Sequence, residues 1–166
     1  MNPRETVQEQ ETVFVQEQET ALSIKTILVA VDLFSHSERT VAYALSIARN
    51  FGASLKLVHV YAPPASSEFG TEDICRLLEK DRKDAERRLT NLVDQIRAIY
   101  PKCESLFTTG DPAEQVAKAA IMMRADLIVV GRHHQTLVGR FFKLDQAPKI
   151  IHRATCPVLV WDDDDD

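Results

Sequence analysis

The sequence contains no hydrophobic run long enough to cross a membrane. The longest apolar stretches, Ile27–Val31 and Leu127–Val130, have the length of a β-strand, whereas a membrane-spanning helix needs about 18 apolar residues or more. The opening residues Met1–Glu5 also lack the apolar segment of a signal peptide. We therefore expect a cytoplasmic protein that does not insert into a membrane.

Cysteine is scarce and is not arranged as a disulfide framework. Cys75, Cys103 and Cys156 are odd in number, and none has C-x-x-C spacing. This usage is typical of a reduced, cytosolic compartment. We interpret each cysteine as a small buried or half-buried hydrophobic residue. Cys156 directly precedes Pro157, which favours a structural role over a nucleophilic one.

The motifs of common hydrolases and metal sites are missing. There is no G-x-S-x-G nucleophile elbow and no P-loop G-x4-G-K-[S/T]. His133, His134, Asp145 and His152 lie close in sequence, but adjacent histidines usually point apart and no H-x3-H spacing is present. The sequence thus predicts no catalytic residue, no metal site and no enzyme, with slow ATP hydrolysis as the open alternative.

Charge is unevenly distributed along the 166 residues. Residues 1–24 carry Arg4 against five glutamates, a net charge of −4, and Asp162–Asp166 carry −5. Because the whole chain has a formal net charge of −5, the part between these ends has a net charge of +4. This small excess argues against non-specific nucleic-acid binding, which depends on a strong basic field.

The N-terminal residues contain a short repeat. Val7–Val13 (V-Q-E-Q-E-T-V) returns eight residues later as Val15–Ala21 (V-Q-E-Q-E-T-A). Two copies are too few for a solenoid, and the mixture of Glu and Gln with Val and Thr suits either a helix or a strand. We interpret residues 1–23 as an extension that is flexible or packs on a partner. Residues 162–166 form a solvated acidic tail in this interpretation.

Between these ends, strand-like runs alternate with helical patterns. The run Thr26–Asp32 is apolar almost throughout, as in a strand buried on both faces. The pattern predicts strands at 26–32, 54–60, 103–108, 125–131 and 157–161. It predicts a first helix from Ser35 or Ser37 to Asn50–Gly52 and a second at 71–100, with an apolar stripe from Leu77 to Ile96. A third helix is predicted from Pro112, capped by Asp111, to residue 124, and a fourth at 146–153. Residues 132–145 are predicted to form a loop or a helical approach.

Strands that alternate with helices imply βαβ units and a parallel sheet. We therefore expect residues 24–161 to form a single α/β domain, doubly wound and Rossmann-like, with a five-stranded, mainly parallel sheet and about four helices. Ligands of such sheets bind at the carboxyl ends of the strands, where the strand order reverses. Three of these ends carry Asp32, Tyr61 and Gly131. Asp32 either accepts hydrogen bonds from a ribose or an adenine, or caps the loop that follows it.

Four segments, in a fixed order, carry a family resemblance. They are Ile27–Asp32 (I-L-V-A-V-D), Gly110–Ala113 (G-D-P-A), Ala125–Gly131 (A-D-L-I-V-V-G) and His152–Val160 (H-R-A-T-C-P-V-L-V). With them, residues 24–161 resemble the universal stress protein family. The resemblance implies an adenine-nucleotide-binding fold, similar to the adenine nucleotide alpha hydrolases, and a homodimer that pairs through the last strand.

The resemblance also implies a phosphate-binding loop after the fourth strand, which this sequence has only in part. ATP-binding members carry G-x2-G-x9-G-[S/T], in which glycines let the backbone approach the phosphates. Gly131 matches the first position, but His134 and Leu144 replace the other two glycines and Asp145 replaces the hydroxyl residue. The side chains at 134 and 144 crowd the loop, and the carboxylate of Asp145 repels a phosphate.

Basic residues near this loop offer a second way to hold an anion. Two interpretations remain open: a solvated basic surface, or an anion site in which Arg132 and Arg140 grip a phosphate in place of glycine amides. The candidate ligand is ATP or another adenine nucleotide with Mg²⁺. The candidate nucleotide-binding residues are Asp32, Leu33, Val60, Gly131, Arg132, His134, Arg140, Lys143 and Asp145.

The last strand predicts self-association. Pro157–Trp161 is short and apolar and is expected at the edge of the sheet, where unprotected strands tend to pair. Antiparallel pairing with a second copy closes such an edge. The candidate interface residues are Val158, Leu159, Val160 and Trp161.

Three functions are consistent with these patterns. The first is a dimeric, non-enzymatic stress-response protein with weak or altered nucleotide binding. The second is an adenine-nucleotide sensor with at most slow ATPase activity. The third is an adaptor that docks on a protein partner through its N-terminal repeat. The incomplete glycine motif favours the first.

Overall fold

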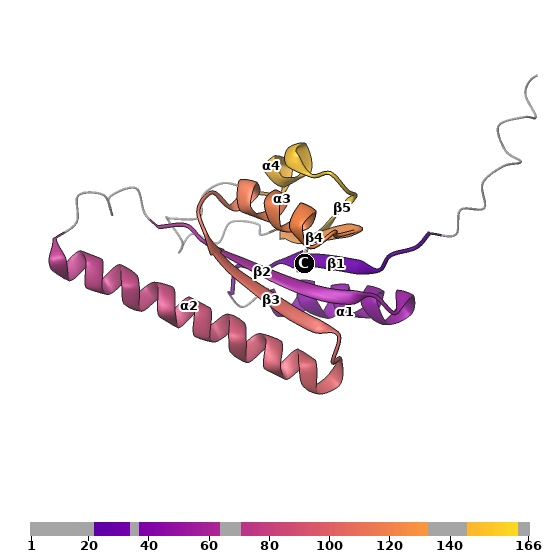
Figure 1. The fold of residues 1–166 in the computed structure, drawn as a ribbon, viewed down its shortest axis with the longest axis horizontal. Helices are drawn as coiled ribbons and strands as arrows, with labels where there is room; N and C mark the ends of the chain where they lie inside the picture. Colours follow the sequence, from indigo (N-terminus) through magenta and orange to yellow (C-terminus); the bar gives the residue numbers. More distant parts are fainter. Residues whose placement is uncertain (1–21, 34–36, 64–70, 133–145, 163–166) are drawn as a thin grey trace, which may run out of the picture.

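A parallel five-stranded sheet forms the centre of the structure, a computed structural model that describes residues 22–33, 37–63, 71–132 and 146–162 (Figure 1). The strands in the described part of the chain are β1 (Thr26–Ala30), β2 (Ser54–Tyr61), β3 (Cys103–Thr109), β4 (Leu127–Arg132) and β5 (Val158–Asp162). The helices are α1 (Ser37–Phe51), α2 (Glu72–Ile99), α3 (Pro112–Met122) and α4 (Ala147–Arg153).

The strands lie in the order β3-β2-β1-β4-β5, and every neighbouring pair is parallel. Helices α1 and α2 cover one face of the sheet and α3 and α4 cover the other (Figure 1). This is the doubly wound α/β arrangement that the alternating pattern predicts. The strand order reverses between β1 and β4, so a crevice is expected at the carboxyl ends of these two strands.

The apolar runs of the central strands are explained by burial on both faces. Along β1, Ile27 and Val29 pack toward α1 and α2, whereas Leu28 packs toward α3 and α4. All three side chains are fully buried. A strand covered on both faces needs an apolar side chain at every position, which is why the sequence shows a continuous run rather than an alternation.

Local signals at two turns are confirmed. Asp111 caps α3 by accepting a hydrogen bond from the backbone N–H of Glu114 at 2.9 Å, and Pro112 occupies the first turn of that helix. Gly52 follows the end of α1 with a φ of +65°, a left-handed conformation that glycine adopts at little cost.

Two predicted strand ends differ from the structure by two residues, for tertiary reasons. The first strand ends at Ala30 rather than Asp32, because the carbonyl oxygen of Val31 is bonded to the side chain of His59 and Leu33 turns away with a φ of +64°. The fourth strand begins at Leu127 rather than at residue 125. The carboxylate of Asp126 accepts the backbone N–H groups of Lys25 and Thr26 at 2.8 and 2.9 Å, so this residue joins two strand starts.

The apolar stripe predicted for the long helix is only half buried. Leu89, Val93 and Ile96 lie in the core, but Leu77 is 66% exposed. A helix of 28 residues is about 42 Å long, whereas an eight-residue strand spans about 26 Å. The first half of α2 therefore extends past the carboxyl ends of the strands (Figure 1).

Some predictions lie outside the described residues. They concern the N-terminal repeat, the loop at 133–145 and the last four aspartates. In the residues that the structure does describe, no helix combines the length and the apolar character that a membrane span requires.

Candidate functional site

The carboxyl ends of β1 and β4 lie side by side at the point where the strand order reverses. Ala30 pairs in register with Val130, so the residues that follow each strand emerge next to each other. Asp32 and Leu33 therefore follow β1 at the same edge of the sheet at which Gly131 lies in β4. Val60, at the end of β2, is buried among apolar residues that pack under α3.

Asp32 joins the end of β1 to the start of α1. The hydroxyl of Ser37 donates a hydrogen bond to the Oδ1 atom of Asp32. Ser37 is the first residue of α1 and is buried, whereas Asp32 is half-buried. This contact is consistent with the interpretation in which Asp32 caps the loop that follows it. A contact of Asp32 with a ligand remains a prediction.

Leu33 occupies a strained backbone conformation directly beside this carboxylate. Its φ of +64° is in the left-handed region, which costs a residue with a Cβ roughly 1–2 kcal/mol. Such strain tends to collect at functional sites. A depression of about 170 Å³ adjoins Leu33 on the side of α1 and α2. Its other lining residues are Ser37, Glu38, Arg88, Asn91, Leu92 and Gln95.

Gly131 has a packing reason to be glycine. A Cβ atom at this position would lie 2.6 Å from the Oγ1 atom of Thr40, a buried residue of α1. Real Cβ atoms do not approach another atom so closely, so Thr40 or the strand would have to move. Sequence reasoning assigned Gly131 to the approach of a phosphate and had no signal for its contact with Thr40.

His59 is a neighbour of this site that sequence reasoning missed. It is 8% exposed, and its Nδ1 atom lies 2.8 Å from the carbonyl oxygen of Val31. A carbonyl can only accept, so Nδ1 carries the proton. Burial lowers the pKa of His59, although the bond to Val31 and the charges of Asp32 and Asp81 act in the opposite direction. The available signal was a single histidine within the apolar run of β2.

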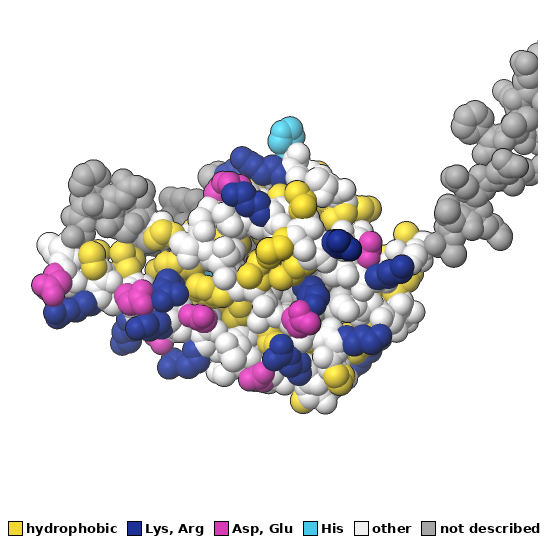
Figure 2. Space-filling view, in the orientation of Figure 1, with side chains coloured by type: hydrophobic (Ala, Val, Ile, Leu, Met, Phe, Trp, Pro, Cys, Tyr) yellow, Lys and Arg dark blue, Asp and Glu magenta, His cyan; other side chains and the backbone are white. Residues whose placement is uncertain are grey.

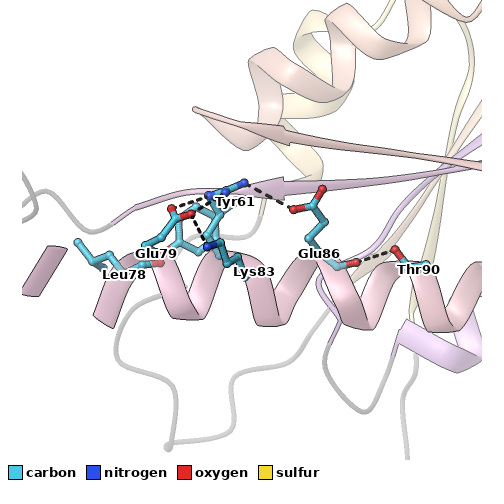
Figure 3. Close-up of polar contacts among 7 residues, drawn as sticks. Tyr61, Leu78, Glu79, Lys83, Glu86 and Thr90 are labelled. Carbon is cyan, nitrogen blue, oxygen red and sulfur yellow. Dashed lines mark hydrogen bonds and ion pairs between the residues drawn. The ribbon is translucent and has the colours of Figure 1, made fainter. Parts of the chain in front are cut away.

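Tyr61 lies at the end of β2 and points toward α2 (Figure 3). Its hydroxyl donates to the carbonyl oxygen of Leu78 at 3.2 Å, and its ring stacks on Phe107, with centroids 6.5 Å apart. Burial and the nearby carboxylate of Asp81 raise the pKa of Tyr61. Tyr61 therefore braces the extended half of α2, a role that differs from lining the crevice between β1 and β4.

Ion pairs on the surface of α2 surround this contact (Figure 3). Glu79 accepts two hydrogen bonds from Arg82, at 2.9 and 3.1 Å, and lies 3.5 Å from the ammonium group of Lys83. The bonds from Arg82 are the main reason that the pKa of Glu79 falls to about 2. These groups are exposed, and pairs of this kind contribute little to stability.

The basic half of the candidate site is not described. His134, Arg140, Lys143 and Asp145 lie outside the described residues. Arg132 is the last residue of β4, where its backbone pairs in register with Asp162. The side-chain anion site therefore stays a prediction.

The last strand lies at the edge of the sheet, as predicted. Among the described residues, β5 pairs only with β4. The ring of Trp161 stacks on Tyr43 of α1, with centroids 4.2 Å apart, and its Nε1 atom is buried with no hydrogen-bond partner in the part of the chain that the structure describes. Val160 is exposed, whereas Val158 and Leu159 are half-buried. Pairing of this edge with a second copy stays a prediction.

Known proteins share this sequence pattern and this architecture. The model of the universal stress protein family matches residues 23–161. A curated universal stress protein of Thermus aquaticus is 37% identical over 139 residues, which cover 82% of this chain and 97% of the relative.

Solved structures give the same picture of the fold. The universal stress protein UspA from Lactobacillus plantarum aligns with a TM-score of 0.67 at 20% identity, over 84% of this chain and 99% of its own. The universal stress protein from Archaeoglobus fulgidus, solved in complex with dAMP, aligns with a TM-score of 0.57 at 23% identity, over 84% of this chain and 98% of its own.

Proposed function

Because this chain belongs to the universal stress protein family, we propose that it is a dimeric, non-enzymatic stress-response protein that binds an adenine nucleotide weakly at the carboxyl ends of β1 and β4. The observation that carries the proposal is the Asp32–Ser37 bond beside the strained Leu33, at the point where the strand order reverses. The dAMP complex of the Archaeoglobus fulgidus relative supports adenine nucleotides as the ligand class.

Asp32 supplies the recognition chemistry in this proposal. An ionised carboxylate only accepts hydrogen bonds and can accept several at once, of which the bond from Ser37 is one. Ribose hydroxyls and the adenine amino group are donors, and both are complementary to a carboxylate. Leu33 and Val60 supply apolar contacts to the same ligand.

Phosphate binding is the weak part of the site. In this proposal the side chains of His134 and Leu144 hinder the approach of backbone N–H groups, and Asp145 repels the phosphates. Arg132, Arg140 and Lys143 offset this repulsion and hold the phosphates, with Mg²⁺ where a triphosphate is bound. The proposed role is therefore binding and signalling, with slow ATP hydrolysis as the alternative.

The remaining parts of the chain have separate roles in the proposal. Residues 24–161 form the nucleotide-binding and dimerising domain, with Val158, Leu159, Val160 and Trp161 at the interface. Residues 1–23 are an extension and residues 162–166 an acidic tail. The protein acts in the cytoplasm through protein partners of the dimer.

Calorimetry on the full, ligand-stripped chain tests the nucleotide proposal. Titrations with ATP and Mg²⁺, AMP and a cyclic nucleotide are compared for the wild type, Asp32→Asn and Asp73→Asn, the last being an exposed acid of α2 that serves as the matched control. We expect weak binding that Asp32→Asn reduces several-fold and that Asp73→Asn leaves unchanged.

Each other result has a definite meaning. Micromolar affinity for ATP that falls with salt and in Arg132→Ala and Arg140→Ala variants favours the nucleotide sensor. Binding that survives Asp32→Asn removes Asp32 from the site. No heat at millimolar ATP overturns nucleotide binding and leaves the protein partners as the function.

A further inference from the structure

Exposed apolar side chains gather at the amino end of the sheet, opposite the candidate nucleotide site. In a parallel sheet with helical crossovers, the ends of the helices and the starts of the strands share one end of the molecule. Helices α1, α2 and α3 end there at Phe51, Ile99 and Met122, and the described chain begins there at Leu22 (Figure 1). These four side chains are 42%, 62%, 65% and 72% exposed, respectively.

Basic side chains lie among these apolar ones. Lys25, Lys102 and Arg124 are exposed and lie in the connections that lead into the strands, and Arg49 is exposed in the last turn of α1. Figure 2 shows dark blue Lys and Arg side chains interspersed with yellow hydrophobic ones at this end of the molecule. We call this surface the amino-end face; it is formed by Leu22, Lys25, Arg49, Phe51, Ile99, Lys102, Met122 and Arg124.

Hydrogen bonds hold these connections side by side as one surface. The ammonium group of Lys102 donates to the carbonyl oxygen of Gly52 at 3.1 Å. The backbone N–H of Ser54 donates to the carbonyl oxygen of Lys25 at 2.7 Å, and that of Lys25 donates to the carboxylate of Asp126 at 2.8 Å. The amino-end face is therefore continuous from β3 through β2 and β1 to β4.

The amino-end face carries unpaired positive charge. Lys25, Arg49 and Arg124 form no ion pair within the described part of the chain. Asp126 is the one acid in these connections, and its carboxylate accepts two backbone N–H groups. The carbonyl ends of three helices add roughly −0.5 each, which still leaves an excess of positive charge beside the four cations.

The segment before Leu22 is chemically complementary to this face. Residues 1–21 hold Arg4 against Glu5, Glu9, Glu11, Glu17 and Glu19, a net charge of −4. They also supply Val7, Val13, Phe14 and Val15 as apolar groups. The segment is joined to the domain at the amino-end face itself, so its effective concentration there is of millimolar order.

Length allows the contact. Twenty-one residues reach at most about 70 Å when extended, whereas four neighbouring strand starts cover only about 15 Å. The geometry points to one occupant: residues 1–21 dock on the amino-end face of their own domain. In this arrangement the repeat glutamates contact Lys25, Arg49 and Arg124, and the valines cover Phe51, Ile99 and Met122. The nucleotide site at the opposite end stays open, so this inference does not depend on the proposed function.

Glutamate-specific proteolysis of the full chain tests the docking. Cleavage after the glutamates of the extension is followed by mass spectrometry for the wild type, for Lys25→Gln/Arg49→Gln/Arg124→Gln and for the control Lys80→Gln/Lys83→Gln/Arg87→Gln. The control removes the same charge from exposed residues of α2. We expect the extension to be cleaved several-fold faster in the face variant than in the wild type or the control. About 0.5 M salt should remove this difference, because the Debye length then falls to about 4 Å.

Three results overturn the inference. Equal cleavage in all three proteins shows that the extension does not dock on this face. Protection that disappears on dilution shows docking on a second copy. A difference that persists in high salt shows that charge does not hold the segment.

Hydrogen exchange of the amides in residues 5–21 provides a second measurement, which begins with the wild type alone. We expect protection in the wild type at low salt and several-fold faster exchange at high salt. The triple variant Lys25→Glu/Arg49→Glu/Arg124→Glu should remove this protection. Combining it with Glu9→Lys/Glu11→Lys/Glu17→Lys, which reverses the charges on the extension, should restore the protection. Absence of protection in the wild type, or failure of the swap to restore it, counts against the docking.

Discussion

His59 donates a hydrogen bond from Nδ1 to the carbonyl oxygen of Val31, over 2.8 Å, and this bond marks the point where β1 leaves the sheet. The backbone N–H of Val31 still donates to the carbonyl oxygen of Val58, so one side of the residue belongs to the ladder between β1 and β2. Asp32 and Leu33 follow directly, at the candidate site. A buried side chain thus sets the exit of the strand that carries Asp32.

Acidification should destabilise the protein through His59. Burial lowers its pKa in the folded state, so below about pH 6.5 the unfolded chain binds a proton that folded His59 does not. Stability is therefore fully present above about pH 6.5 and falls as the pH drops toward the lower, folded pKa. The loss amounts to about 1.4 kcal/mol for each unit by which the pKa is lowered. Urea unfolding at several pH values measures this loss.

His59→Asn is the matched variant for this measurement. The amide nitrogen of asparagine takes the place of Nδ1 as a donor to Val31, but it does not titrate. We expect the wild type to lose stability relative to the variant as the pH falls below 6.5. Parallel pH profiles for the two proteins would assign the acid sensitivity to other groups.

Gly131→Ala should destabilise the domain by about 1–3 kcal/mol, the usual cost of overpacking a filled site. The added Cβ atom would lie 2.6 Å from the Oγ1 atom of Thr40. Thr40→Ala removes that atom, so the double variant should recover part of the loss. A denaturant-based double-mutant cycle measures the coupling between the two positions. Strictly additive effects would show that the contact with Thr40 is not the reason for glycine.

The sequence predicts the interior of the fold better than its edges. The runs that become β1, β2 and β4 are apolar because helices cover both faces of the sheet, and this requirement is visible in the residues themselves. The cap at Asp111 and Pro112 is equally local. The end of β1 is not, because it depends on a side chain from another strand.

The same distinction holds for the candidate site. The position of Asp32 follows from a general rule about doubly wound sheets, so it could be predicted before any contact was known. The contact between Gly131 and Thr40 joins residues that are distant in the chain, and the sequence around each of them contains no signal that predicts it. Burial of the whole apolar stripe of α2 could not be predicted either, because the apolar spacing continues beyond the sheet that buries the second half of the helix.

Tyr43→Ala should expose the ring of Trp161, the single tryptophan of the chain. The two rings stack with centroids 4.2 Å apart and an interplanar angle of 26°. Aromatic pairs contribute about 0.5–1.5 kcal/mol beyond the area they bury. We expect a red shift of tryptophan emission and a lower urea midpoint, whereas Tyr43→Phe should preserve both. An unchanged emission spectrum in Tyr43→Ala would contradict the stacking.

Tyr61→Phe should loosen the first half of α2 without unfolding the domain. The variant removes only the hydroxyl that donates to the carbonyl oxygen of Leu78, a bond that contributes about 1 kcal/mol. Because the buried residues of α2 begin at Leu89, the preceding turns have few other contacts to hold them.

Hydrogen exchange localises this effect. Amides in residues 72–82 should exchange several-fold faster in Tyr61→Phe, whereas those around Val93 should keep their wild-type rates, because that part of α2 lies in the core. Thr90→Val is the control: its hydroxyl bonds to the carbonyl oxygen of Glu86 on the exposed side of the same helix, so its loss should leave residues 72–82 unchanged. Equal acceleration along the whole helix would mean that α2 opens as one unit and that Tyr61 is not the local brace.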